Sequence, residues 1–422
     1  MRGNVQQLFI TELKIEKVRH LRDIKIPLER DFRKHLILTG CNGSGKTSVL
    51  EDLAGHLNGI ATAAEKIEQA EGHIKFYESQ LKKLREQGKR DGETVQTEEK
   101  LAFWNDRLLS LRGGVSVEMN RPVGEMRYAF DKGEFVLGYY GAERTFQVSV
   151  TKHIEKVELK GNYAITENTR QEFMKYLADC QVTAALAKNR GDMEKADKIN
   201  SWFLSLLELL KKIYDDESLQ LIFDEDSYNF KIKQKGREDF DFNTMSSGFS
   251  AVWDIISDLI LKMEKITERS FIFDVPGIVL IDEIETHLHL KMQKNIMNIL
   301  TTVFPNVQFI VSTHSPFILN SGENAVIFDL EKQILVRDGL SNVPYGGVVE
   351  GYFNASELSH DLDKKFKRFR ELTGQESLSV EELEEIADLE FYLDEIPDYL
   401  ALNLTTEYQR LKLKFEKREE KV

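Results

Sequence analysis

The stretch Leu36 to Leu50 reads LILTGCNGSGKTSVL, an apolar strand followed by a glycine-rich loop and the start of a helix. Its middle part, Gly40 to Thr47, fits the phosphate-binding pattern GxxxxGK[ST] in the strand, loop and helix context that this pattern requires. Glycines let the backbone turn tightly, so successive N–H groups and the helix N-terminus can point at phosphate oxygens. The stretch therefore predicts a binding site for nucleotide phosphates.

The pattern also assigns roles to individual residues of this loop. We expect Lys46 to reach the β- and γ-phosphates of ATP, and the Thr47 hydroxyl to ligate Mg²⁺. The other predicted nucleotide-binding positions supply backbone N–H groups or small side chains: Gly40, Asn42, Gly43, Ser44, Gly45 and Ser48. ATP and Mg²⁺ are the predicted cofactors.

The composition is that of a globular protein with a substantial core. The chain has 422 residues, 41% of them hydrophobic, which allows two or three domains or one large domain with insertions. It contains no long apolar run and no charged-then-apolar leader, so we expect a cytoplasmic protein without membrane contact. Cys41 and Cys180 are predicted to be reduced thiols. The net charge of −14 argues against wrapping of nucleic acid around the protein, but leaves a local DNA-binding patch open.

Two carboxylates end a second apolar strand, Gly277 to Ile281. Asp282 is placed to hold Mg²⁺, and Glu283 to orient and deprotonate the attacking water. A surface turn is the alternative reading of two adjacent acids. The other motifs, in their order along the chain, favour the catalytic interpretation.

A third apolar strand, Gln308 to Ser312, runs into a histidine. His314 fits a residue that contacts the γ-phosphate. Between the two strands lie His287 and His289, which could be read as metal ligands. An HxH pair without a nearby third ligand is a weak zinc signal, so we favour the nucleotide interpretation for this region.

A serine-containing stretch, NTMSSGF at residues 243–249, precedes the helical pattern AVWDIISDLILKM. A serine hydroxyl, small-residue amides and a helix N-terminus together can clamp a phosphate. The stretch resembles the LSGGQ signature of ABC-type ATPases. Ser246 and Gly248 match that signature, whereas Ser247 replaces a glycine and Phe249 replaces the glutamine. In that family the clamp closes on the γ-phosphate held by the other subunit.

An inserted coiled-coil arm is predicted after the first helix, which continues from Ser48 to Asn58. Apolar residues then recur at alternating spacings of four and three. They are Ala63, Ile67, Ala70, Ile74, Tyr77, Leu81 and Leu84, followed by Leu101, Trp104, Leu108 and Leu111. We expect a short antiparallel hairpin. The tip carries Lys82, Lys83, Arg85, Lys89 and Arg90. This cluster is either a solvated surface or a contact for DNA phosphates or a partner.

The remaining periodicities predict strands and one further helical segment. Residues 8–28 alternate as two strands with Arg19 at their turn. The segments VSVEM, RYAFDK, EFVLGYYG and TFQVSV, after Gly113, suggest strands of an antiparallel sheet. Residues 167–214 suggest amphipathic helices whose apolar stripe serves core or dimer packing, and strands follow around 219–223 and 228–232.

The order of these motifs, together with YYGAER and the run EIETHLHL to QFIVSTHSP, resembles the OLD/SMC-like ABC-type ATPases of the AAA-15 and AAA-21 groups. The resemblance covers roughly residues 8–350 and implies an α/β ATPase head with a mixed sheet. It also implies a homodimer with two sandwiched nucleotides, or a higher ring. Ser246 would act on the nucleotide of the other subunit, residues 285–290 would form the D-loop at the interface, and Arg144 would approach the nucleotide or interface.

The predicted organisation has six parts. They are residues 1–59 (N-terminal lobe of the head), 60–112 (coiled-coil hairpin), 113–166 (head strands), 167–217 (helical insertion), 218–350 (head with signature, acidic strand and histidine) and 351–422 (helical acidic C-terminal region). The acidic stretch from Leu372 to Leu400 either docks a basic partner or is solvated.

Many relatives fuse the head to a TOPRIM nuclease, and Glu350, Asp361 and Asp363 imitate its motifs. Only about ten residues separate them, too few for that fold, so we expect no built-in nuclease. Relatives without TOPRIM occur in antiphage defence, in the PtuA family of Septu and retron operons and the AriA family of PARIS. The resemblance thus implies a nucleotide-dependent sensor or scaffold that controls a separate effector, a nuclease. The alternative is a DNA-repair or DNA-structuring ATPase that binds duplex DNA directly; a transporter ATPase ranks third.

Overall fold

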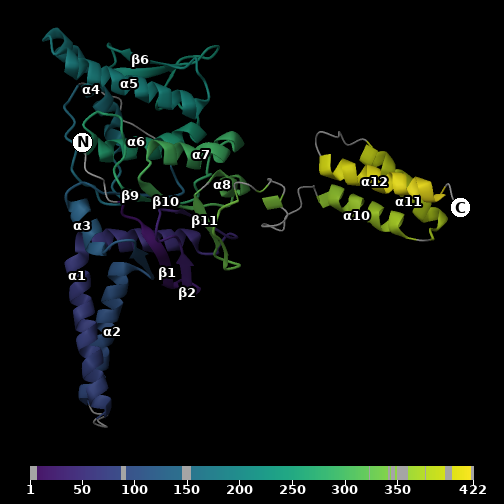
Figure 1. The fold of residues 1–422 in the computed structure, drawn as a ribbon, viewed down its shortest axis with the longest axis horizontal. Helices are drawn as coiled ribbons and strands as arrows, with labels where there is room; N and C mark the ends of the chain where they lie inside the picture. The colour runs from purple at the N-terminus through teal and green to yellow at the C-terminus, as the bar shows by residue number, and fades with distance from the viewer. Residues whose placement is uncertain are drawn as a thin grey trace. The chain divides into compact units, whose positions relative to one another are not determined.

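The computed structural model describes residues 7–86, 92–144, 154–322, 324–340, 343, 347–348, 360–375, 377–394 and 402–419. The chain divides into two compact units, residues 1–342 and 343–422 (Figure 1). The first unit contains strands and helices in alternation, and the second contains helices among its described residues. The predicted α/β class with a mixed sheet is confirmed for the first unit.

A six-stranded sheet forms the centre of the first unit. Its order is β12-β11-β3-β10-β9-β5, and all neighbours are parallel except β11 and β12. The strands are β3 (His35–Thr39), β5 (Val136–Tyr140), β9 (Gly277–Ile281), β10 (Val307–Ser312), β11 (Ala325–Asp329) and β12 (Ile334–Val336). β3, β9 and β10 are buried along their whole length, as expected for parallel strands covered on both faces. Their carboxyl ends therefore meet at one edge.

A second sheet, β2-β1-β4, packs beside the first helix. It consists of β1 (Ile10–Val18), β2 (Leu21–Pro27) and β4 (Val115–Met119), all antiparallel. The predicted hairpin of residues 8–28 is confirmed. Its turn lies against the phosphate loop, since a Cβ added to Gly45 would come within 3.0 Å of Leu21 Cδ1.

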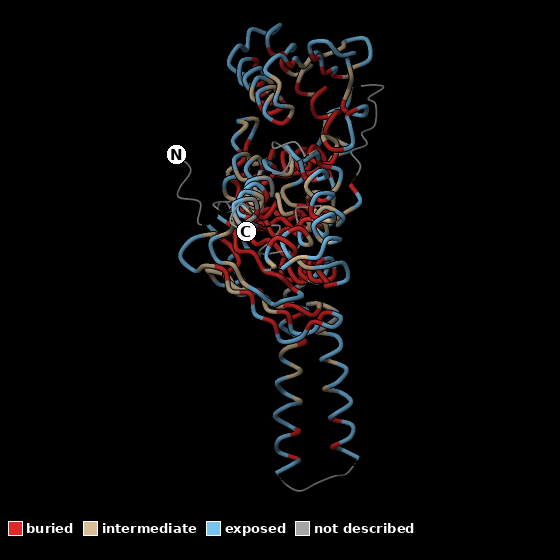
Figure 2. Tube along the Cα trace, turned by 90° about the vertical axis from the view of Figure 1, so that its right-hand side faces the viewer, coloured by how far each residue is buried: buried red, intermediate tan, exposed pale blue. Residues whose placement is uncertain are grey.

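The predicted arm is a pair of antiparallel helices, α1 (Lys46–Glu86) and α2 (Gly92–Arg112). Figures 1 and 2 show them side by side, projecting from the head with exposed outer faces. α1 is one continuous helix from the phosphate loop to the tip. Ile67, Ala70, Leu81 and Leu84 of the seam are buried, and His73 stacks on Trp104 with ring centroids 4.1 Å apart. The Ala63 side chain and the tip residues Lys89 and Arg90 lie outside what the structure describes.

After Gly113 one predicted strand is a helix, and another is a strand whose pairing direction was predicted wrongly. The segment RYAFDK lies mostly in helix α3 (Val123–Asp131), because Met126 and Phe130, four residues apart, bury one helical face. The segment EFVLGYYG contains β5 as predicted, but β5 pairs parallel with β9 instead of antiparallel. TFQVSV lies outside the described residues.

The helical insertion stands at the end of the head opposite the arm (Figure 1). It contains η1 (Arg170–Glu172), α4 (Phe173–Asn189) and α5 (Met193–Tyr214), followed by the small sheet β6 (Gln220–Asp224), β7 (Asn229–Lys233) and β8 (Phe240–Asp241). The apolar stripe of α5, including Trp202 and Leu206, is buried. The predicted helices are confirmed, and of the two roles left open for the stripe, core packing or dimer packing, the structure shows core packing. The chain then enters α6 (Ser247–Thr267), α7 (Leu290–Val303) and α8 (Pro316–Ser321).

The second unit contains α10 (His360–Gly374), α11 (Val380–Asp394) and α12 (Leu402–Glu419). Phe369, Leu372, Leu393 and Tyr408 are the most buried residues of its core. The predicted acidic helix thus has one packed face. Within the described residues, no helix is both long and apolar enough to cross a bilayer.

Candidate functional site

The edge where β3, β9 and β10 end brings together three segments that are far apart in sequence. Parallel pairing sets Ser312 beside Leu38 and Val311 beside Ile281. The phosphate loop, the acidic pair and the histidine loop therefore leave the sheet next to one another. The carboxyl edge of a parallel sheet is where ligands bind in open α/β folds.

The phosphate loop has the strained backbone that glycine permits. Gly40, Gly43 and Gly45 have φ angles of 136°, 84° and 98°. A Cβ at Gly40 would come within 2.9 Å of Ser44 Oγ, so this position has no room for a side chain. Among the described residues, none accepts a hydrogen bond from the backbone N–H groups of Gly43, Gly45, Lys46 or Thr47. These free donors at the start of α1 suit an anion.

Lys46 lies folded over this loop and is almost fully buried. Its Nζ donates to the carbonyl oxygens of Gly40 and Cys41 at 2.9 and 3.1 Å. Burial lowers the pKa of Lys46, while the carboxylates of Asp282 and Glu283 act in the opposite direction. The charged ammonium group therefore faces both the loop and the acidic pair. A phosphate in the loop would offer Nζ better acceptors than the two carbonyls.

Ser312 at the end of β10 joins the two acidic residues. Its Oγ donates to Asp282 Oδ1 at 2.5 Å and accepts a hydrogen bond from the backbone N–H of Glu283 at 2.7 Å. Asp282 is 2% exposed, whereas Glu283 is half-buried and has a φ of 44°, in the left-handed region. Thr286 Oγ1 donates to Glu283 Oε2 at 3.1 Å. The carboxylates are thus held in defined positions next to Lys46.

Arg144, at the end of the YYGAER segment, clamps the backbone of the same turn. Its Nη1 donates to the carbonyl oxygens of Gly141 (2.8 Å) and Asp282 (2.5 Å), and its Nη2 donates to that of Glu283 (2.7 Å). The side chain is buried, which lowers its pKa. The structure therefore places Arg144 behind the acidic pair, where its guanidinium group donates hydrogen bonds to three backbone carbonyl oxygens.

His314 lies half-buried just after β10. Its backbone N–H donates to Glu285 Oε1, whereas Glu285 Oε2 is buried without a partner among the described residues. Ser315 caps α8 by accepting from the Phe317 N–H, and its Oγ donates to Gln293 Oε1 at 2.7 Å. The histidine loop is thereby fixed to both the acidic turn and α7.

Residues 246–249, which resemble the signature, lie at the start of α6 and pack on His287 and His289. A Cβ at Gly248 would come within 2.7 Å of the His287 carbonyl oxygen, so glycine is required there. Phe249 stacks on Tyr214, with ring centroids 3.9 Å apart. Ser246 is exposed and its side chain makes no capping bond. Among the described residues, no hydrogen bond joins residues 246–249 to the phosphate loop, and no group of three or more metal-ligating side chains includes His287 and His289.

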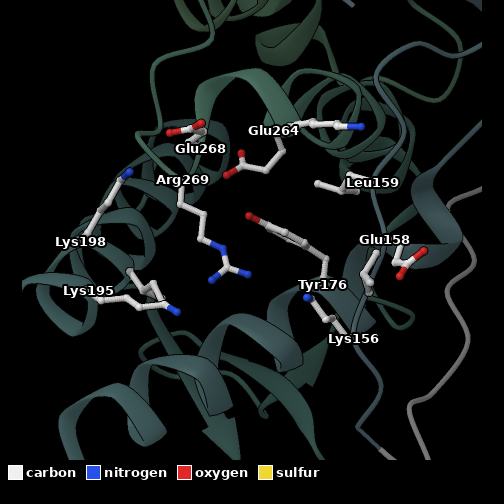
Figure 3. Close-up of a pocket in the computed structure, with 12 residues that line it drawn as sticks. Lys156, Glu158, Leu159, Tyr176, Lys195, Lys198, Glu264, Glu268 and Arg269 are labelled. Atoms are coloured by element: carbon white, nitrogen blue, oxygen red, sulfur yellow. The ribbon is translucent and has the colours of Figure 1, made fainter. Parts of the chain in front are cut away.

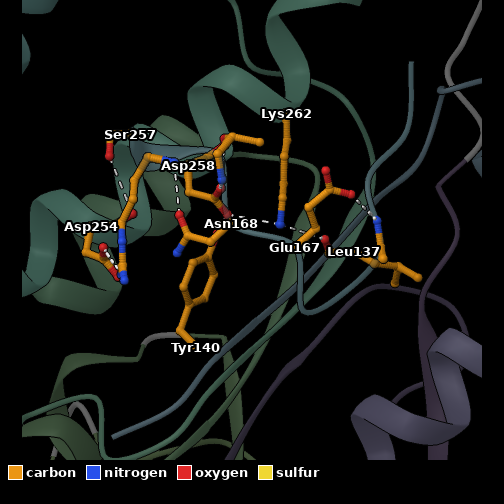
Figure 4. Close-up of polar contacts among 11 residues, drawn as sticks. Leu137, Tyr140, Glu167, Asn168, Asp254, Ser257, Asp258 and Lys262 are labelled. Atoms are coloured by element: carbon orange, nitrogen blue, oxygen red, sulfur yellow. Dashed lines mark hydrogen bonds and ion pairs between the residues drawn. The ribbon is translucent and has the colours of Figure 1, made fainter. Parts of the chain in front are cut away.

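A buried polar network supports the signature helix from behind (Figure 4). Asp258 Oδ2 accepts from the Tyr140 hydroxyl (2.6 Å) and pairs with Lys262 Nζ (3.0 Å), while its Oδ1 accepts from the Thr169 hydroxyl (2.8 Å). Arg170 pairs with Asp254 one turn earlier. Tyr140 is the last residue of β5 and lies within YYGAER, so this network connects α6 with the strand that leads to Arg144.

The residues present fit ATP and Mg²⁺. The loop supplies unpaired N–H donors and a buried ammonium group. Thr47 is exposed, and Asp282 Oδ2 accepts no hydrogen bond within the described part of the chain, so a hydroxyl and a carboxylate oxygen remain available to a cation. Hard oxygen ligands are those that Mg²⁺ prefers. Asn42 is exposed at the loop surface, and Ser44 and Ser48 are buried beneath it.

Several residues of this site have no role in the sequence prediction. Ser312 and Glu285 stand within motifs quoted there, but only the fold shows that they hold the acidic pair and His314. Glu331, whose carboxylate accepts from the Cys41 N–H at 3.2 Å, follows β11 and has no motif. Asp258 and Lys262 are one helical turn apart, a spacing that also occurs on exposed helices. Both cysteines are free thiols, Cys41 exposed and Cys180 buried.

The fold and the site together define an α/β ATPase with a phosphate-binding loop. The family described as "AAA domain, putative AbiEii toxin, Type IV TA system" matches residues 185–320. The chain is similar to the Septu protein PtuA of Bacillus mycoides (strain KBAB4), at 26% identity over 96% of this chain and 53% of that protein. It is also similar to the retron Vc95 probable ATPase of Vibrio cholerae serotype O1 biovar El Tor, at 47% identity over 17% of this chain and 14% of that protein.

The chain spans about half or less of the length of the curated relatives it matches. A solved structure of an Smc head bound to the C-winged helix domain of ScpA covers 76% of this chain and 93% of its own chain, at 15% identity and a TM-score of 0.35.

Proposed function

We propose that this chain binds ATP with Mg²⁺ and hydrolyses it slowly between two copies of itself, as the ATPase subunit of an antiphage defence complex. The observation that supports this most strongly is the convergence of Lys46, Asp282 and Glu283 at one sheet edge. Lys46 Nζ donates to two loop carbonyls, and Ser312 Oγ joins the Asp282 carboxylate to the backbone N–H of Glu283. The PtuA and retron similarities support the place in defence.

Each residue of the site has a distinct task in this proposal. The loop N–H groups and Lys46 bind the β- and γ-phosphates, and Thr47 and Asp282 would hold Mg²⁺, which neutralises phosphate charge when bound. Glu283 orients the attacking water and accepts its proton, because its carboxylate follows the buried Asp282 and is fixed by Thr286. His314 contacts the γ-phosphate from the neighbouring loop.

The second half of the clamp comes from another copy of the chain. Ser246 is exposed, and residues 246–249 make no hydrogen bond with the phosphate loop of their own chain within the described residues. A second copy related by a two-fold axis would bring Ser246 to each nucleotide and create two equivalent sites. ATP favours the paired state because it contacts both copies, and this is how the nucleotide would control a separate effector, a nuclease.

The test is affinity purification of the full chain from cells, as wild type, Glu283→Gln and Lys46→Ala, with every co-purifying protein identified and quantified. We expect a stoichiometric second protein with Glu283→Gln, which retains ATP, and a changed amount of it with Lys46→Ala. Recovery of the chain with DNA and no second protein, in all three forms, would favour a DNA-structuring ATPase instead.

A further inference from the structure

A pocket of about 580 Å³ lies in the helical insertion, apart from the nucleotide site. It is formed by α4, α5, the C-terminal end of α6 and the segment Lys156–Leu159 (Figure 3). Its volume falls within the range of roughly 300–1,000 Å³ that is usual for small-molecule sites. The same helix α6 carries the signature at its other end.

Positive charge is concentrated around this pocket. Five cationic side chains line it, compared with three carboxylates: Lys156, Lys195, Lys198, Lys265 and Arg269 against Glu158, Glu264 and Glu268. None of the four lysines forms an ion pair with any residue that the structure describes. The chain as a whole has a net charge of −14, whereas the residues that line this pocket carry more positive than negative charges. Such an arrangement attracts an anion.

The inner end of the pocket presents buried polar atoms without well-formed hydrogen bonds. Tyr176 and Glu264 are each 2% exposed. The two groups lie close to each other and to Cys180, but neither the Tyr176 hydroxyl nor Glu264 Oε1 makes a well-formed hydrogen bond to a described residue. Figure 3 shows both side chains pointing into the same space as the Arg269 guanidinium. A buried polar group without a well-formed hydrogen bond is unfavourable, so a ligand that pairs with these atoms would be bound more tightly than one that does not.

Helix α6 ends where it borders the pocket. Glu268 is its C-cap, and Glu268 and Arg269 have φ angles of 50° and 60°, the left-handed conformation in which many helices end. Arg269 Nη2 donates to Asp179 Oδ2 at 3.4 Å, and its guanidinium lies 5.7 Å from the centre of the Tyr176 ring.

We propose that this pocket binds a nucleoside monophosphate, with the phosphate on the lysine rim and an edge of the base at Tyr176 and Glu264. Glu264 Oε1 accepts from an N–H of the base, and the Tyr176 hydroxyl pairs with a second polar atom of that edge. Val157, Leu159 and Ile199 supply the apolar wall that a base and ribose require. A purely anionic ligand such as inorganic phosphate would leave the inner polar atoms unpaired.

The test uses the full chain carrying Lys46→Ala, which removes nucleotide binding at the phosphate loop. Calorimetric titration is made with AMP, GMP, CMP, UMP and inorganic phosphate. We expect one of the mononucleotides to bind once per chain, at least tenfold more tightly than phosphate. Adding Lys195→Ala and Lys198→Ala should weaken this binding by at least tenfold. Adding Glu264→Gln should weaken the preferred base and change the order of preference among the four.

The matched control adds Lys188→Ala and Lys211→Ala to the Lys46→Ala chain. Lys188 lies in α4 and Lys211 in α5, two of the helices that line the pocket, but neither lysine lines it. We expect this control to bind as tightly as the Lys46→Ala parent. Lys195 and Lys198 are exposed, so their removal should leave the thermal midpoint unchanged. The proposal is overturned if none of the mononucleotides binds at millimolar concentration, if phosphate binds equally well, or if the control loses as much affinity as the pocket variant.

Discussion

Arg144 Nη2 donates a hydrogen bond to the backbone carbonyl of Glu283 at 2.7 Å, and its Nη1 holds the carbonyl of Asp282 at 2.5 Å. Both acidic residues of the proposed site therefore depend on one buried guanidinium group. Glu283 has a φ of 44°, which an isolated glutamate seldom adopts. Arg144 thus acts as a positioning residue, through the backbone that carries the two carboxylates.

Replacing Arg144 by Gln should lower kcat for ATP hydrolysis by about 10- to 100-fold, because a misplaced base or metal ligand costs of that order. KM for ATP should change less than about threefold, since the phosphate loop does not contact Arg144. Steady-state kinetics measure both constants. An unchanged kcat, or a loss confined to KM, would show that the clamp does not position the acidic pair.

The hydroxyl of Ser312 should also be needed for rapid ATP hydrolysis. Ser312→Ala removes the hydroxyl that joins Asp282 Oδ1 to the Glu283 N–H, so we expect kcat to fall by roughly tenfold, about 1.4 kcal/mol of transition-state stabilisation. Ser312→Thr keeps a hydroxyl and should retain more activity than Ser312→Ala. If both variants hydrolyse ATP like the wild type, the bridge has no role in the reaction.

The network around Asp258 should be essential for stability. Asp258→Ala leaves Lys262 as a buried charge without its partner and removes the acceptor of the Tyr140 hydroxyl. The expected loss is about 3–5 kcal/mol in the free energy of unfolding. Urea unfolding of the full chain measures it. As a control, Asp363→Ala removes an exposed pair with Lys367 and should cost less than about 1 kcal/mol. Equal effects of the two substitutions would contradict the structural role of Asp258.

The free energy of unfolding should depend on pH because of His35. It is buried in β3, and its Nδ1 accepts from the Phe309 N–H at 3.0 Å. Burial, with the nearby Arg33 charge, lowers its pKa to about 3 from an unfolded value of 6.5. Between these values the unfolded state binds the additional proton, so stability falls as the pH drops below 6.5, by at most about 1.4 kcal/mol per pH unit.

His35→Gln isolates this contribution, because the amide oxygen of glutamine can accept the same hydrogen bond without titrating. The urea midpoint of the wild type should decrease more steeply from pH 7 to pH 5 than that of His35→Gln. Parallel curves for the two proteins would mean that His35 is not held neutral in the folded state.

The ATPase core could be predicted from sequence because its chemistry is local. The glycine loop, the acidic pair and His314 each follow a buried apolar strand, and a parallel sheet brings such strand ends together whatever lies between them. The α/β class, the hairpin of residues 8–28 and the coiled-coil arm were also predictable, because each follows from the regular spacing of apolar residues within a short stretch of sequence.

What could not be predicted depends on tertiary contacts. Arg144 lies within a recognisable motif, yet only the fold reveals that it binds carbonyls 138 and 139 residues away. In RYAFDK apolar and polar residues alternate as in a strand, but the segment lies mostly in α3. The helix forms because it buries Met126 and Phe130 together against the core. The insertion pocket gave no sequence signal, since its four lysines come from three separate segments and each alone resembles an ordinary solvated charge.

The central claim is that each nucleotide is completed by Ser246 of a second copy, and mixing two inactive variants tests it directly. Lys46→Ala lacks the phosphate lysine, and Ser246→Arg blocks the clamp; each alone should be inactive. In a mixed dimer, the intact Lys46 of one copy meets the intact Ser246 of the other, so equal mixing should restore about a quarter of wild-type ATP hydrolysis. No recovery on mixing, or full activity of Ser246→Arg alone, would contradict a site shared between two copies.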